Sequence, residues 1–167
     1  MKVYREKFEV QSAGLHPTFH DVTVKVKEIL ASSGVKDGIC VVYSHHTTCS
    51  VMTQECSHDK TYFGLEYLQQ DLCNIMEKLI PSCQVEGQYM HPGKEHIEFA
   101  MGLGTEEGEF TSLNTDAHLR SVFFGRSETV VIMDGKLDLG DFGYVYFVDW
   151  DRIRARKRTV QVQIIGE

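Results

Sequence analysis

The sequence predicts an α+β fold in which antiparallel strands form a β-rich sandwich or barrel. Residues 2–12 and 160–164 alternate between apolar and polar side chains, so strands are expected near both ends of the chain. Asp134-Gly135 stands between two apolar runs, a pattern typical of a two-residue hairpin turn. Residues 60–80 carry leucines at steps of three and four, which indicates an amphipathic helix inserted between the strands.

Size and composition point to one globular domain spanning residues 1–167. The chain is 42% apolar and 25% charged, and its net charge of −7 argues against nonspecific binding to nucleic acid. Its five cysteines include no C-x-x-C pair, so neither a disulfide framework nor a cysteine zinc ribbon is expected. There is no segment of signal-peptide type and no apolar stretch long enough for a membrane. We therefore expect a cytoplasmic protein with free thiols.

The first half of the chain predicts two strands and a helix after the N-terminal strand. Thr18 and Asp21 resemble a capping box that opens a helix, and Gly34 would end it. A strand at 22–27 is the competing interpretation, because valines alternate there with polar residues. Residues 39–43 form a continuous apolar run typical of a buried strand, which we place at 38–45, and a second strand follows at 50–53.

The second half begins with the helix at 60–80, whose polar face we expect in solvent. Residues 91–113 are rich in glycine and glutamate, and predict a long loop or lobe with a weak strand at 97–101. A short third helix follows Asn114 and ends near Gly125. The hairpin of 129–133 with 136–137 and strands at 144–148 and 160–164 complete the predicted sheet.

Residues 44–50, at the end of the strand 38–45, combine histidines and threonines at the rim of the predicted core. Eight histidines in a chain of this size favour a metal site, yet no H-E-x-x-H or H-x-H spacing occurs. Ligands would therefore have to converge from distant segments. The alternative is a pair of surface histidines beside a threonine turn.

Four segments resemble motifs of a known family. Residues 46–55 are similar to H-T-[TS]-A-[GS]-L-T-[IL]-N-E, and residues 89–91 to Y-x-H. Residues 114–121 are similar to N-A-D-A-H-[IL]-K-A, and residues 134–140 to N-G-[RK]-L-x-L-G. An arginine-rich run before the last strand also recurs. The chain thus resembles the YjbQ-like family, often called the secondary thiamine-phosphate synthase family, along nearly its whole length.

The resemblance implies a β-rich sandwich with two main helices and a short third, assembled as a homotrimer. It also implies a divalent metal, zinc, held by His46, His91 and His118. Three neutral imidazoles would leave a fourth position open for water or substrate. His45 lies outside the motif and is expected to be a neighbour rather than a ligand.

The resemblance further implies roles for residues around the metal. Asp116 would orient a histidine or accept a proton. Thr47, Thr48 and Arg120 would hold an anionic small-molecule substrate. The structural alternatives are turn hydrogen bonds for the threonines and a solvated helix face for Arg120.

One departure from the family is the stretch of about two dozen residues between His91 and His118. The segment 92–113 could cover the site, or His96 could replace His91 as a ligand.

We expect a metal-dependent enzyme with weak thiamine-phosphate synthase activity, a transferase reaction. The alternatives are a zinc-dependent hydrolase of a phosphorylated or acyl compound, and a noncatalytic trimer that binds a metal or an anion. Cys49 could be a nucleophile beside His46, although strand packing is its expected role.

Overall fold

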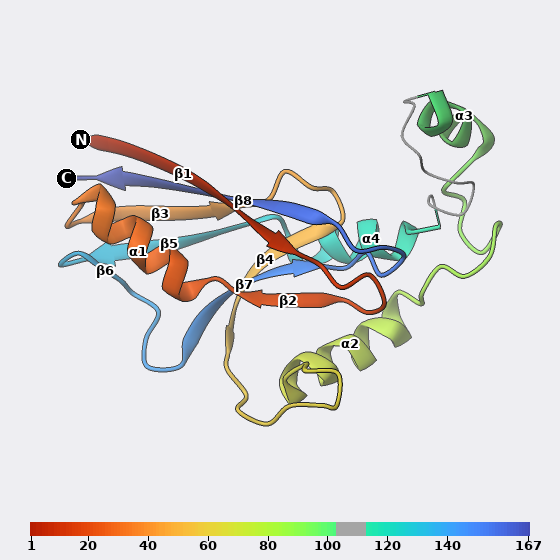
Figure 1. Cartoon of the computed structure of the whole chain (residues 1–167), viewed down its shortest axis with the longest axis horizontal. Helices are drawn as coiled ribbons and strands as arrows, with labels where there is room; N and C mark the ends of the chain where they lie inside the picture. The colour runs from red at the N-terminus through yellow and green to blue at the C-terminus, as the bar shows by residue number, and fades with distance from the viewer. Residues whose placement is uncertain (103–112) are drawn as a thin grey trace.

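Two antiparallel sheets form the body of the protein in this computed structural model, which describes residues 1–102 and 113–167. The larger sheet has five strands in the order β1 (Lys2–Gln11), β8 (Lys157–Gly166), β3 (Gly38–Tyr43), β5 (Ser127–Met133) and β6 (Lys136–Leu137). The smaller sheet has the order β2 (Thr18–Asp21), β7 (Gly143–Asp149) and β4 (Cys49–Glu55). The predicted β-rich α+β fold is confirmed (Figure 1).

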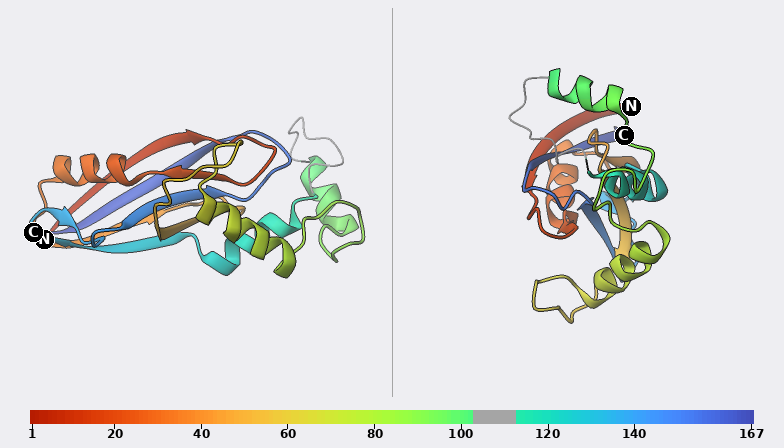
Figure 2. Two further views of the ribbon diagram at one scale, coloured as in Figure 1. Left: turned by 90° about the horizontal axis from the view of Figure 1, so that it is seen from below. Right: turned by 90° about the vertical axis from the view of Figure 1, so that its right-hand side faces the viewer.

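The helices lie at the two ends of this body. α1 (Thr23–Ser33) lies near the chain termini, which are side by side because β1 pairs with β8 (Figure 2). At the opposite end lie α2 (Tyr67–Leu79), α3 (Lys94–Gly102) and α4 (Thr115–Phe124). Among the helices of residues 1–102 and 113–167, none is long and apolar enough to cross a membrane.

Strand β7 links two apolar clusters because it is buried on both faces. Phe147 and Val145 belong to the larger cluster, which also contains the inward side chains of α1 and of the five-stranded sheet. Tyr146 and Trp150 belong to the smaller one, where the Trp150 ring stacks on Phe124 with centroids 5.2 Å apart. Both clusters thus meet at the strand that leads into the arginine-rich segment.

The predicted start of the first helix is wrong. Residues Thr18–Asp21 form β2, which pairs with β7, and α1 begins only at Thr23. Asp21 nevertheless contacts the start of the helix, because its Oδ1 accepts a hydrogen bond of 2.9 Å from the backbone N–H of Thr23. The predicted end is confirmed: Gly34 follows α1 in the left-handed conformation, with φ of 67°.

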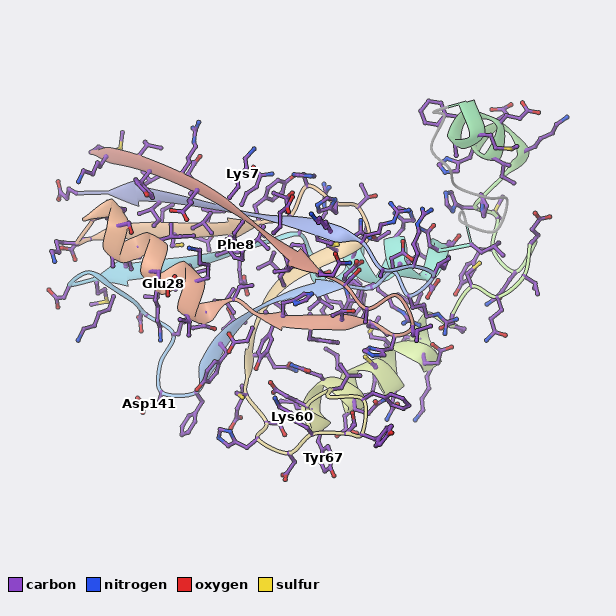
Figure 3. All side chains as sticks on the ribbon, in the orientation of Figure 1. Lys7, Phe8, Glu28, Lys60, Tyr67 and Asp141 are labelled. Carbon is purple, nitrogen blue, oxygen red and sulfur yellow. The ribbon has the colours of Figure 1, made fainter. Side chains whose placement is uncertain are left out.

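The helix predicted at 60–80 is confirmed in type, but its buried side matches the prediction only in part: Met76 is buried and Leu72 packs beside it, as expected. Gln69 is buried, whereas Ile75 and Leu79 are 52% and 63% exposed. The cause is Glu66, which is buried just before the helix and accepts hydrogen bonds from the hydroxyl of Tyr146 and a backbone N–H. Glu66 and Gln69 also form a capping box, so the polar side of this turn faces inward. Tyr67 points outward (Figure 3).

The segment between His91 and α4 is partly helical. The strand predicted at 97–101 is wrong, because these residues belong to α3. Residues 103–112, the rest of the predicted loop, lie outside the described residues. The short helix before Gly125 is confirmed as α4, and the hairpin turn is confirmed at Asp134 and Gly135, with φ of 50° and 74°.

Candidate functional site

A pocket of about 350 Å³ lies at the end of the molecule that carries α3 and α4. Four separate parts of the chain contribute to it: the loop after β3, helix α3, the start of α4, and the segment that leads from β7 into β8. We call it the histidine–arginine pocket. Its lining residues are His45, His46, Thr47, Thr48, His96, Ala100, Asn114, His118, Asp151, Arg154, Arg156 and Arg158.

The loop after β3 contributes four consecutive lining residues, 45–48. The backbone N–H of Cys49 donates to the carbonyl of His46 over 3.2 Å, which closes a turn around the two threonines. The hydroxyl of Ser44 accepts a hydrogen bond of 3.2 Å from the backbone N–H of His46. A single turn thus brings His46, Thr47 and Thr48 to the same cavity.

Arg158 is a firmly anchored cation of the pocket. It is 5% exposed and donates twice to the buried carboxylate of Asp149, over 2.7 and 3.2 Å, and once to Thr48 Oγ1 over 3.1 Å. Burial works to lower the pKa of Arg158, but the hydrogen bonds and charge of Asp149 outweigh it and raise the pKa. Arg158 is therefore a fixed positive charge at the start of β8.

Arg154 and Arg156 lie on the same side of the chain as Arg158, in the segment that leads into β8. Side chains two apart in an extended chain lie on one side, and exposure alternates along residues 153–158. Arg154, Arg156 and Arg158 line the pocket, while Lys157 is exposed and lies 3.8 Å from Glu9. We call these three arginines the arginine wall.

The hydrogen bonds of His46 determine which ring nitrogen is available. Its Nε2 accepts a bond of 2.9 Å from the backbone N–H of Thr159. In a neutral imidazole the other nitrogen, Nδ1, then carries the proton. Burial, with the charges of His45 and Arg158, lowers the pKa of His46 and favours this neutral form. As placed, His46 can donate a hydrogen bond to a ligand but has no lone pair for a metal.

His91 and His118 keep a free lone pair. The Thr115 hydroxyl donates to the His91 carbonyl over 2.7 Å, so its oxygen accepts from His91 Nδ1 over 2.9 Å and leaves Nε2 as the acceptor. His118 interacts with the backbone of Thr47. Burial is the largest cause that lowers the pKa of both histidines. Their ring centroids lie 5.7 Å apart, and the ring of His96 lies 4.5 Å from that of His91.

These histidines fit a metal only in part. Within residues 1–102 and 113–167, no three histidine, cysteine or carboxylate side chains are placed to hold a metal ion together. His91 and His118 have the hydrogen-bonded second nitrogen that metal ligands usually have. The His46 ring lies tilted against that of His45, with centroids 4.2 Å apart, and is hydrogen-bonded to β8. The ligand set His46, His91 and His118 stays a prediction.

Comparison with known proteins places the chain in a protein family. Residues 6–167 match the family described as UPF0047 protein YjbQ-like. The chain belongs to this family. It is 26% identical to a UPF0047 protein of Methanothermobacter thermautotrophicus over 167 residues, covering all of this chain and 95% of that relative. It is 30% identical to the UPF0047 protein MJ1081 of Methanocaldococcus jannaschii, covering 88% and 84% of the two chains.

Solved YjbQ-like structures share the fold. A YbjQ-like protein of unknown function from Sulfolobus solfataricus superposes with a TM-score of 0.76 at 23% identity, over 99% of each chain. An uncharacterized YjbQ/UPF0047 protein from Clostridium acetobutylicum gives a TM-score of 0.72 at 28% identity, over 96% of this chain and 99% of that one.

Two residues that the family resemblance suggested lie outside the pocket of this YjbQ-like chain. Asp116 and Arg120 are one turn apart on α4, whereas His118 lies between them and faces the other way. Arg120 is buried and donates to Glu77 over 2.9 Å and to the Ile80 carbonyl over 2.7 Å. Its charge therefore ties α4 to α2.

Asp116 is equally enclosed. Its Oδ2 has no hydrogen-bond partner among the described residues and lies 3.9 Å from Arg120 Nη2. Burial raises the pKa of the Asp116 carboxyl, against the opposing effects of the Cys83 backbone and Arg120. The roles suggested for Asp116 and Arg120 stay predictions, and their placement between α4 and α2 favours a structural role.

The arginine wall is the part of the pocket that motif reasoning did not place there. Arg154, Arg156 and Arg158 stand in the arginine-rich run before the last strand. Their spacing of two before a strand was the signal that could have placed them on one side. Asp149, which anchors Arg158, gave no such signal, because it ends an apolar strand without a motif of its own.

Proposed function

We propose that this protein is an enzyme that binds a phosphate-bearing small molecule in the histidine–arginine pocket. The observation that carries the proposal is the charge of the lining. Among the described lining residues there are three arginines and four histidines but only one acidic residue, Asp151. Asp151 lies 3.7 Å from Arg158 and accepts a bond of 3.4 Å from Asn114. It shares Arg158 with the buried Asp149, so the three arginines stand against two carboxylates. Guanidinium groups match phosphate oxygens in geometry as well as charge.

Each part of the pocket has a proposed task. The arginine wall binds the phosphate, and the Nδ1–H of His46 and the exposed hydroxyl of Thr47 add hydrogen-bond donors. Burial lowers the pKa of His118 and favours its neutral form, so His118 can offer a ring nitrogen to a metal ion. Thr48 orients Arg158 through its hydroxyl oxygen.

The family resemblance suggests the reaction. Thiamine-phosphate synthase chemistry joins a pyrimidine diphosphate to a thiazole phosphate and releases pyrophosphate. Charge grows on the departing pyrophosphate, and fixed guanidinium groups beside it would stabilise that charge. A second candidate is hydrolysis of a phosphate ester, which is favoured by the neutral imidazoles of His91 and His118, because zinc held there would lower the pKa of a water.

An activity assay tests this proposal and separates the two reactions. Wild-type protein is compared with His118→Ala and with Arg5→Ala, an exposed arginine on β1, in a thiamine-phosphate coupling assay and on a panel of phosphate esters. We expect turnover in one assay that His118→Ala lowers about 100-fold and Arg5→Ala leaves unchanged. Turnover no faster than that of His118→Ala in every assay would contradict an enzymatic function and leave a binding protein.

Zinc is the proposed cofactor, with His91 and His118 as two of its ligands. When bound, zinc would offset charge on a phosphate oxygen or lower the pKa of a water. The third ligand would be His46, after release of its bond to Thr159, or His96, which lies beside His91.

Metal analysis of purified variants decides the ligand set. We expect stoichiometric zinc in the wild type and in the exposed control His58→Ala, and its loss in His118→Ala. A loss in His46→Ala but not in His96→Ala would favour the family ligand set, and the reverse would favour His96. Unchanged zinc in His118→Ala would reject both sets.

A further inference from the structure

Helix α3 contributes little to the packed core of this protein. None of its residues is buried, and its ion pair, Lys94–Glu98, joins two exposed side chains over 3.8 Å. In two views it stands apart from the sheets, beyond α4 (Figures 1 and 2). Burial of apolar surface therefore does not explain why a helix occupies this place.

One side of α3 nevertheless faces the histidine–arginine pocket. His96 and Ala100 are four residues apart, on the same side of the helix, and both line the pocket. The ring of His96 packs on that of His91, whose Nδ1 and carbonyl both bond to Thr115 at the start of α4. The position of His96 is thus tied to the element that carries His118.

We propose that α3 is the specificity element of this pocket, with His96 and Ala100 contacting the part of the ligand beyond its phosphate group. This inference rests on the proposed function. The phosphate binds at the arginine wall, which comes from a different element than α3. A volume of about 350 Å³ lies within the range of pockets that hold small organic molecules. The ligand class is therefore a phosphate ester with a polar organic group, which the imidazole of His96 can hydrogen-bond.

Calorimetric titration with two probes, inorganic phosphate and ribose 5-phosphate, tests the inference. Inorganic phosphate reports on the arginine wall and the donors beside it, none of which comes from α3, whereas ribose 5-phosphate adds a polar organic group. Because Ala100→Phe fills space on the α3 side, we expect it to weaken ribose 5-phosphate binding about tenfold and inorganic phosphate binding less than about twofold. His96→Ala should weaken only ribose 5-phosphate, by about threefold.

Gly102→Phe is the matched control. Gly102 is two residues from Ala100, on the other side of α3, and a Cβ added there meets no atom of residues 1–102 or 113–167 within 4 Å. This variant should bind both probes like the wild type, and circular dichroism should show all variants folded. Equal effects of Ala100→Phe on both probes, or none on either, would overturn the role of α3 while leaving the proposed function intact. Wild-type protein that binds neither probe would overturn both.

Discussion

Arg158 connects the pocket to the core at the scale of a single residue. Its partner Asp149 is fully buried, so removal of the guanidinium leaves a carboxylate without its main partner. We expect Arg158→Gln to lower the free energy of unfolding by about 3 kcal/mol, the usual cost of breaking a buried pair from one side. Urea unfolding followed by circular dichroism measures this.

A double variant provides the control. Asp149→Asn together with Arg158→Gln removes both charges and should recover more than half of the lost stability, because no uncompensated charge remains. A loss below about 1 kcal/mol in Arg158→Gln would show that water or another cation replaces the pair.

The buried histidines predict a pH dependence of stability. Burial is the main cause that lowers the pKa of His20, His46, His91 and His118. Below the unfolded value of about 6.5, the unfolded chain binds more protons than the folded one, so the free energy of unfolding falls on acidification. The stabilisation is complete above about pH 6.5 and is lost as pH falls toward the lowered folded pKa values.

Urea unfolding between pH 8 and pH 5.5 measures this slope. His20 lies outside the pocket, and its Nε2 is buried with no hydrogen-bond partner among the described residues. His20→Gln should therefore flatten the slope, whereas His58→Gln, at an exposed position, should not. An unchanged slope in His20→Gln would show that its ring gains a solvent partner in the folded protein.

Sequence reasoning found some pocket residues and misplaced others, for physical reasons. His46, Thr47 and Thr48 follow a buried strand, so their place at its end could be predicted. Asp116 and Arg120 came with the same motif as His118, yet helical geometry turns them toward α2. The bond from Thr159 to His46 depends on β8 lying beside β3, a pairing that no local pattern reveals.

At the scale of an element, the carboxylate of Glu66 fixes the orientation of α2. It accepts a 2.9 Å bond from the hydroxyl of Tyr146, and both side chains are buried. We expect Tyr146→Phe to lower the free energy of unfolding by about 2 kcal/mol, since it leaves a buried carboxylate with one donor fewer. Tyr67→Phe, at an exposed position of α2, should have no effect. Equal unfolding midpoints for the two variants would contradict this role of Glu66.

The same carboxylate explains why the buried side of α2 differs in part from the predicted one. Leucines at steps of three and four predict a helix, and the helix is present. Which side is buried, however, depends on the two groups that donate hydrogen bonds to Glu66. These are the hydroxyl of Tyr146, which is distant in sequence, and the backbone N–H of Ser57, which lies in the loop before the helix. Thr18–Asp21 likewise has the pattern of a capping box but pairs with β7 instead.

At the scale of the whole molecule, β5 leaves an apolar surface on the outside of the larger sheet. Val130 and Ile132 are buried, while Val131 and Met133, on the other face, are 50% and 56% exposed. Val131 pairs across the sheet with Ile39, which is 39% exposed. Strands that are apolar on both faces are usually covered on both. We propose that this surface is covered by other copies of the chain in the homotrimer that the family resemblance implies.

Substitution of Val131 tests that assembly. A lysine there places a charge in the proposed interface, where burial without a partner is costly, so we expect Val131→Lys to form monomers. Light scattering coupled to size-exclusion chromatography measures the mass of the assembly against the 19.0 kDa chain. Val24→Lys is the matched control, because Val24 is 68% exposed on α1, which packs on the inner face of the sheet, opposite the face that carries Val131. If the wild type forms a trimer and Val131→Lys leaves it intact, the contact between subunits lies elsewhere, and the exposed apolar residues of α2 become the next surface to substitute.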